Sequence, residues 1–245
     1  MKKAMFGLAC AAAMVACADI ESANIVGYTN KDAGADFSLS VAMFNSVGAS
    51  TIGIQSIIPV GENVSGDGNV NMQTFTTDAN ADETFMWLTA DEAGVEDGDG
   101  WYDEDMATKS TKEFAPGEGF MFCAGNGAIQ LQFAGEVNTA KVTVDVPADF
   151  SLLGNIRPVA IGIQTIIPTG ENISGDGNVN MQTFTADANA DETFMWLTAD
   201  EAGVEDGDGW YDEDMATKST KEFAPGEGFM FCAGNGAAKV EFSAL

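Results

Sequence analysis

The sequence contains no histidine and only four cysteines in its 245 residues. Without histidine, Ser-His-Asp and Cys-His catalysis are excluded, and so is a zinc site with histidine ligands. No Gly-Lys-Ser/Thr sequence occurs, so a phosphate-binding loop of that kind is excluded as well. Two of the cysteines, Cys10 and Cys17, lie near the N-terminus, which leaves Cys123 and Cys232 for the remainder of the chain.

Basic residues are also scarce. Lysine and arginine together number 10 against 38 aspartates and glutamates, which gives a formal net charge of −28. Nucleic acid is excluded as a partner, because phosphate binding depends on clustered lysine and arginine. The same charge argues against adhesion to anionic lipid. Divalent cations, cationic surfaces or saline surroundings fit this composition better.

Long hydrophobic runs are missing, and the longest one indicates export. A transmembrane helix needs about 20 apolar residues, so no transmembrane segment is expected. Lys2 and Lys3 precede an apolar stretch from Ala4 to Val15, and Ala16-Cys17-Ala18 has the form of a cleavage site. Residues 1–18 are therefore predicted to be a signal peptide of an extracellular or cell-surface protein. In the alternative interpretation Cys17 is lipidated and anchors the protein to a membrane.

A tandem repeat accounts for most of the chain. Residues 52–128 align without gaps to residues 161–237 and differ from them at only four positions. Looser similarity extends the two units to residues 24–136, called repeat 1 here, and 137–245, called repeat 2. Each unit has the length of a common domain, so we expect two separate domains, each able to fold alone. Such close identity also makes a catalytic site between two dissimilar halves improbable.

The hydrophobic pattern predicts strands. Residues 129–133 and 141–146 alternate between apolar and polar side chains, and residues 84–88 are β-branched, apolar and aromatic between acidic turns. Residues 70–76 are a further candidate strand. Asn126-Gly127 favours a tight turn, so residues 120–133 are expected to form a hairpin, with Phe120 and Phe122 facing the core. The predicted fold class is all-β, with two tandem near-identical sandwich or barrel-like domains.

Several short motifs occur in a familiar order. Phe37–Leu39 lies near the start of repeat 1, Gly100–Asp103 in the middle, and Pro116–Phe122 and Phe133–Gly135 near the end. This order resembles exported bacterial β-domain repeats with Gly-Trp-Asn-Leu-Ile-Ser-Leu-Pro at the start and Pro-Gly-x-Gly-Tyr-Trp-Val near the end. The opening Trp and Pro are absent here, and Phe-Met replaces Tyr-Trp. The resemblance implies a non-catalytic β-domain on an exported protein and carries over no functional residues.

The remaining cysteines, Cys123 and Cys232, occupy equivalent positions in the two repeats. One cysteine per domain cannot form a disulfide within a domain. The thiols are therefore expected to be unpaired, to bridge the two domains, or to link separate molecules into an oligomer, which an oxidising exterior would permit.

An acidic stretch suggests a cation site. Residues 78–105 hold eleven carboxylates and no basic residue, and repeat 2 has the same carboxylates. Calcium prefers six to eight oxygen ligands, and alternating Asp and Asn residues can direct side chains to one centre. The alternative interpretation is a solvated acidic surface. If calcium binds, its candidate ligands are Asp78, Asn80, Asp82, Asp97, Asp99, Asp103, Asp187, Asn189, Asp191, Asp206, Asp208 and Asp212.

The aromatic pairs Trp101-Tyr102 and Trp210-Tyr211 lie among these acids. They could stack on sugar rings, and two copies would add avidity toward glycans. The alternative is that each pair packs a loop onto its domain. The leading functional hypothesis is a secreted or cell-surface structural or adhesive protein that contacts other surface proteins. A carbohydrate-binding protein is the second, and a glycoside hydrolase with a pair of carboxylates is the third.

Overall fold

The computed structural model describes residues 26–34, 36–64, 69–92, 97–125, 127–173, 178–200, 207–234 and 236–245. Within these ranges the chain forms twenty β-strands and two single-turn 3₁₀ helices, η1 (Ile54–Ser56) and η2 (Ile163–Thr165). The predicted all-β class is confirmed. None of the helices in the described part of the chain is long and apolar enough to cross a membrane.

Repeat 1 contributes ten strands. They are β1 (Val26–Ala33), β2 (Ser38–Val41), β3 (Ile52–Gly53), β4 (Ile57–Val60), β5 (Val70–Phe75), β6 (Ala81–Leu88), β7 (Gly100–Asp103), β8 (Glu113–Phe114), β9 (Gly119–Ala124) and β10 (Ile129–Glu136). Repeat 2 contributes the other ten. They are β11 (Val142–Val146), β12 (Asp149–Gly154), β13 (Ile161–Gly162), β14 (Ile166–Thr169), β15 (Val179–Phe184), β16 (Ala190–Leu197), β17 (Gly209–Asp212), β18 (Glu222–Phe223), β19 (Gly228–Ala233) and β20 (Ala238–Phe242).

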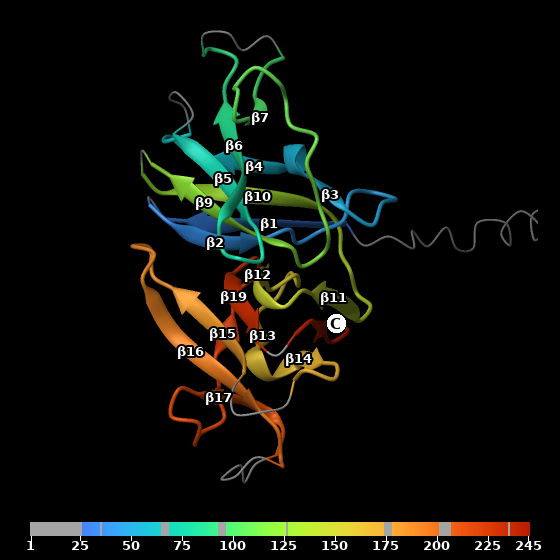
Figure 1. The fold of residues 1–245 in the computed structure, drawn as a ribbon. Helices are drawn as coiled ribbons and strands as arrows, with labels where there is room; N and C mark the ends of the chain where they lie inside the picture. Colours follow the sequence, from blue (N-terminus) through green and yellow to red (C-terminus); the bar gives the residue numbers. More distant parts are fainter. Residues whose placement is uncertain are drawn as a thin grey trace, which may run out of the picture.

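The strands of each repeat build three antiparallel sheets with the same order. Repeat 1 has a five-stranded sheet β2-β9-β5-β6-β7, a three-stranded sheet β1-β10-β4 and a two-stranded sheet β3-β8. Repeat 2 has β12-β19-β15-β16-β17, β11-β20-β14 and β13-β18. Every sheet consists of strands from one repeat only. Figure 1 shows repeat 1 in blue to green above repeat 2 in yellow to red.

Alternation along the strands places the core as the sequence indicates. In β9, Phe120 and Phe122 are fully buried, whereas Met121 and Cys123 lie on the half-buried outer face. In β10, Ile129, Leu131 and Phe133 are buried in the same way. Because successive strand residues point to opposite faces, one apolar set in each strand faces the sandwich interior.

The predicted hairpin at residues 120–133 is wrong. The turn itself is present, since the Gly127 amide donates to the Ala124 carbonyl. However, β9 pairs with β2 and β5, while β10 pairs with β1 and β4. Both edges of β9 are therefore already occupied, and the chain turns a corner into another sheet instead of pairing back on itself.

The two repeats pack closely against each other through β2, β12 and the starts of β9 and β19. The hydroxyl of Ser40 donates to the Gly226 carbonyl at 3.1 Å. A Cβ atom on Gly119 would lie 2.8 Å from the Leu152 carbonyl carbon, and one on Gly228 would lie 2.7 Å from that of Leu39. Glycine is required at both positions for this approach. The buried apolar residues of the two repeats accordingly form one continuous core cluster.

Candidate functional site

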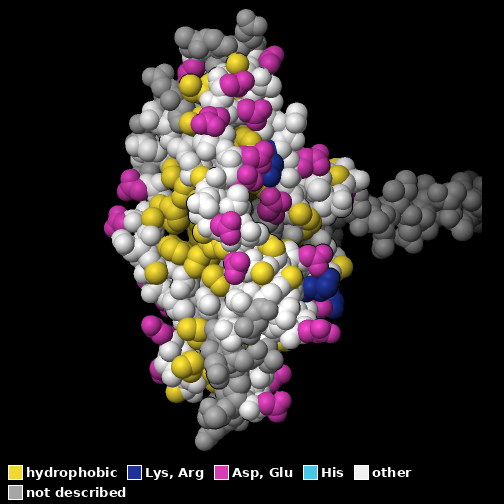
Figure 2. All heavy atoms as spheres, viewed as in Figure 1, with side chains coloured by type: hydrophobic (Ala, Val, Ile, Leu, Met, Phe, Trp, Pro, Cys, Tyr) yellow, Lys and Arg dark blue, Asp and Glu magenta, His cyan; other side chains and the backbone are white. Residues whose placement is uncertain are grey.

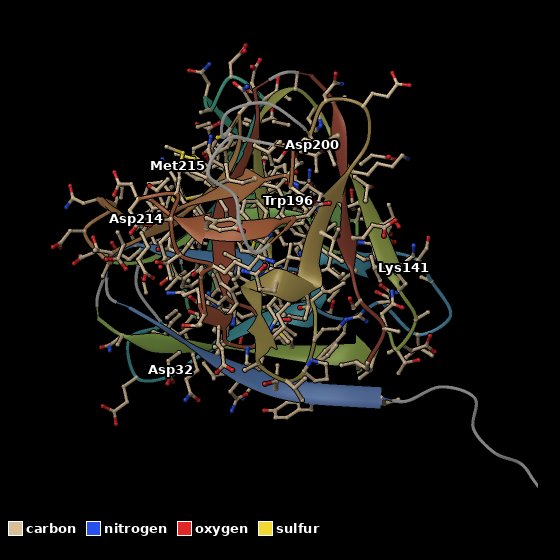
Figure 3. All side chains as sticks on the ribbon, turned by 90° about the horizontal axis from the view of Figure 1, so that it is seen from below. Asp32, Lys141, Trp196, Asp200, Asp214 and Met215 are labelled. Atoms are coloured by element: carbon tan, nitrogen blue, oxygen red, sulfur yellow. The ribbon has the colours of Figure 1, made fainter. Side chains whose placement is uncertain are left out.

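The tryptophan proposed to bind sugar is part of the core. Trp101 in β7 lies opposite Trp87 in β6 and is fully buried. Its Nε1 donates to the Ile57 carbonyl at 2.6 Å, and its ring meets that of Trp87 edge-to-face with centroids 5.5 Å apart. In repeat 2, Trp210 makes the same hydrogen bond to Ile166 at 2.6 Å. Figure 3 shows its neighbour Trp196 inside the fold, with Asp214 and Met215 at the periphery.

The neighbouring tyrosines are buried as well. The Tyr102 hydroxyl donates to the Gly98 carbonyl at 2.8 Å, and Tyr211 donates to Gly207 at 2.9 Å. Burial, followed by the nearby charges of Asp97 and Asp99, raises the pKa of Tyr102. No ring face of Trp101 or Tyr102 is left open to a ligand. The interpretation of Trp101, Tyr102, Trp210 and Tyr211 as a glycan platform is therefore corrected, and the packing alternative is the one observed.

A glutamine that the sequence pattern does not single out fixes this aromatic strand. Gln55, in η1, donates through Nε2 to the carbonyls of Trp101 at 2.7 Å and Ser110 at 2.9 Å. Its Oε1 accepts from the Trp101 amide at 3.1 Å. Gln164 repeats these three contacts in repeat 2. Buried backbone groups must be paired, and one amide side chain here pairs three of them.

The acidic loop beside β7 is held by its own side chains. Asp99 accepts a hydrogen bond from the Ala90 amide at 2.7 Å, and Lys109 donates to the Asp97 and Asp99 carbonyls at 2.8 and 2.9 Å. Asp105 accepts from the Ala107 and Thr108 amides, and these bonds lower its pKa. These aspartates thus act as turn caps, as short acidic side chains commonly do.

The candidate calcium ligands do not converge. Asp78 and Asn80 are exposed in the turn between β5 and β6, whereas Asp82 is exposed on β6 itself. In the described ranges, no three Asp, Glu or Cys side chains form a group that could hold a metal ion. Asp97, Asp99, Asp103, Asp187, Asn189, Asp191, Asp208 and Asp212 belong to no such group either, while Asp206 lies outside the described residues.

Both cysteines are free thiols on the outer faces of β9 and β19. No disulfide between these two thiols joins the repeats in the described part of the chain. Burial raises the pKa of the Cys123 thiol, and the charge of Asp36 raises it further; Cys232 is affected in the same way by burial and Asp149. A raised thiol pKa lowers the fraction of reactive thiolate. An oligomer linked through Cys123 or Cys232 remains a prediction.

Repeat 2 contains a buried arginine that repeat 1 lacks, and it joins the segment before β11 to the end of β20. Arg157 is 1% exposed, and its guanidinium donates to the carbonyls of Asn138, Ala140, Phe242 and Ser243. Desolvation lowers its pKa. The equivalent position in repeat 1 is Phe44, which is also buried. Sequence reasoning missed Arg157, although a lone arginine in so acidic a chain is a usable signal.

Comparison of the chain with protein-family models, curated proteins and solved structures finds no match.

Proposed function

We propose that this protein is an exported structural or adhesive protein of the cell surface or extracellular space, and that it is not an enzyme. The observation that carries the proposal is the placement of its carboxylates. Among the described residues, no aspartate or glutamate is buried, and Asp99 and Asp105 beside β7 cap turns. The duplicated fold therefore presents the same acidic exterior twice, which favours multivalent contact with a cationic partner or surface.

The same placement argues against a glycoside hydrolase. That chemistry needs two facing carboxyl groups, one of them held protonated by an apolar or otherwise perturbing environment. Asp99 and Asp105, on either side of β7, are solvent-accessible and accept hydrogen bonds from backbone amides instead. The sequence also lacks histidine, the side chain most often used in general acid–base catalysis.

Cell fractionation tests the location. A C-terminally tagged chain is expected outside the cytoplasm, and deletion of residues 2–18 is expected to retain it inside. Cys17→Ser separates the two forms of export, because it would abolish incorporation of a labelled fatty acid if Cys17 is lipidated and would change nothing if the chain is simply cleaved.

Adhesion is tested with beads of defined charge. Cells that carry the protein on their surface should bind amine-coated beads better than carboxylate-coated beads, and the preference should fall with added salt. A cytoplasmic location, or equal binding to both beads, would overturn the proposal.

A further inference from the structure

A groove of about 270 Å³ runs along the line where the two repeats meet. Its walls are apolar and come equally from both repeats. The larger side chains are three pairs of equivalent residues, Phe37 and Phe150, Phe75 and Phe184, and Met121 and Met230. A leucine and an alanine from each repeat complete the lining. Figure 2 shows hydrophobic side chains gathered at this junction on one face of the molecule.

The contacts across the groove are reciprocal. The Phe37 ring lies 6.1 Å from that of Phe184, and the Phe75 ring lies 6.2 Å from that of Phe150, measured between centroids. Phe37 thus meets the counterpart of Phe75, and Phe75 meets the counterpart of Phe37. This reciprocity describes a two-fold relation between the repeats, in which residue i contacts j and the counterpart of j contacts that of i. A chain consequently has one such groove, and the groove exists only when the two repeats are together.

The walls are accessible and are not part of the closed core. All six side chains of the three pairs are half-buried, unlike the fully buried Phe120 and Phe122 on the other face of the same sheet. A contiguous apolar surface of this kind, rimmed by polar residues, is typical of a contact site for another molecule.

Four aspartates, called the rim aspartates here, directly precede residues that line the groove. Asp36 and Asp149 precede Phe37 and Phe150 in the chain, and all four of these residues reach the solvent to some extent. The charge of Asp36 acts on Cys123 and that of Asp149 acts on Cys232, so both carboxylates lie near the strands that carry Met121 and Met230. Asp78 and Asp187, both exposed, directly precede the two lining alanines.

The backbone beside the groove is held in an unusual conformation. The lining alanines Ala79 and Ala188 both have φ of 58°, and Asp149 has φ of 74°. This left-handed region is unfavourable for a non-glycine residue, and such residues cluster at sites of function. Three of the five positions with this property in the described residues border the groove. Glycine would avoid the cost, but it would also remove the methyl groups from the walls.

Charge decides between occupants. A second copy of the chain would bring the same four carboxylates and a further net charge of −28, and an anionic membrane would be repelled likewise. The volume lies just below the range of about 300–1,000 Å³ typical of sites for drug-sized molecules, so the groove suits an inserted side chain better than a separate ligand. A large apolar side chain in a central pocket with charged contacts at the rim is the usual form of an interface anchor.

We propose that the groove binds a short basic segment of a partner protein. The segment inserts one large apolar side chain between the four phenylalanine rings and places lysine or arginine side chains against the rim aspartates. The site goes beyond the proposed function, since it does not depend on where the protein is located. Because the walls are two-fold related, the two repeats contribute equally to the affinity.

A titration with a defined peptide tests the proposal. The probe is the amidated, acetylated peptide Lys-Lys-Phe-Leu-Lys-Lys, labelled with a dye and added to the chain lacking residues 1–18. We expect one binding site per chain and an affinity at least tenfold higher than for Lys-Lys-Ser-Ser-Lys-Lys or Glu-Glu-Phe-Leu-Glu-Glu. Two sites per chain would locate binding in the acidic loops of each repeat. Equal affinity for the serine peptide would indicate charge alone. Either result, or no binding, would overturn the proposal.

Variants locate the site. Met121→Lys and Met230→Lys each place a cation in the groove, and each should weaken binding at least tenfold and to the same extent. Ile58→Lys is the matched control, because Ile58 is an apolar residue, 41% exposed, on the separate strand β4; it should bind normally. If the methionine variants fail to fold, the combined change Asp36→Asn and Asp149→Asn decides, since both residues are exposed. It should lower the affinity and reduce its salt dependence, and unchanged binding would contradict the proposal.

Discussion

Lys31 offers a sharp test of the contact between the repeats. It lies in β1, and its Nζ donates to the Leu39 carbonyl near Gly226 of repeat 2. Burial lowers the pKa of Lys31 from 10.5 to about 8, although the charge of Glu227 acts in the opposite direction. The equivalent residue of repeat 2 is Val144, which lies against Gly117 in the same way. The substitution Lys31→Val therefore copies what the second repeat already has.

Proton linkage sets the direction in which the Lys31 proton changes stability with pH. Between pH 8 and pH 10.5 the unfolded chain retains the Lys31 proton while the folded chain has lost it, so this residue makes stability rise with pH. Below about pH 8 both states are charged, and the folded state bears the cost of the buried ammonium group. One unit of pKa corresponds to about 1.4 kcal/mol, so the cost is at most about 3.5 kcal/mol. Lys31→Val removes this cost, whereas loss of the bond to Leu39 opposes the gain.

The measurement is urea unfolding of both proteins from pH 6.5 to pH 11. Any change in packing adds a constant to the difference in free energy of unfolding, while the Lys31 proton adds a part that depends on pH. We expect the advantage of the variant to shrink by up to about 3.5 kcal/mol as the pH rises through this window. Lys141→Val is the control, because the Lys141 side chain is 57% exposed; it should show no such trend. A difference for Lys31→Val that does not change with pH would refute the reasoning.

Three further outcomes are expected. Trp101→Phe should lower the free energy of unfolding by about 1–3 kcal/mol in urea titrations, because it leaves the Ile57 carbonyl without its donor; a change no larger than that of Met106→Ala, at an exposed site, would contradict the packing role. Arg157→Met removes the donors of four carbonyls, so hydrogen exchange should accelerate at the start of β11 and the end of β20. Unchanged exchange would contradict the role of Arg157 in holding these two strand ends together. Molar NaCl should raise the melting temperature by screening the acidic surface, and CaCl₂ at equal ionic strength should raise it no further; an additional calcium effect would show a site that the described residues do not form.

Much of the fold is readable because strand alternation is a local property. Residues 70–76 and 84–88 were expected as strands, and β5 and β6 occupy them with at most a few residues of difference at the ends. The two-residue strands β3 and β8 give no periodic signal, so no pattern could predict them. Strand pairing is not local either. The turn after Ala124 is compatible with a hairpin and with a passage into another sheet. The second arrangement is found because both edges of β9 are already paired, with β2 and β5.

The candidate site was harder to predict, for a different physical reason. Trp101 among carboxylates has the composition of a sugar site, but the strand places its ring inward against Trp87. The groove is lined by outward-facing apolar residues, and matching them between the two repeats requires two different alignment offsets. Phe37 and Phe150 are separated by 113 positions, whereas Phe75 and Phe184 are separated by 109, because the loop after β2 is four residues longer than the loop after β12. A search at a single offset cannot pair these residues.

The central claim is that two equivalent halves meet across a two-fold relation, and the isolated second repeat tests it most directly. A fragment of residues 137–245 contains all the strands of its three sheets. It also retains Gly228, Leu152 and Phe150, which contact repeat 1 in the whole chain. Two fragments can therefore reproduce the contact with each other. Light scattering after size-exclusion chromatography is predicted to find a folded dimer, and a folded monomer at every concentration or an unfolded chain would contradict the account.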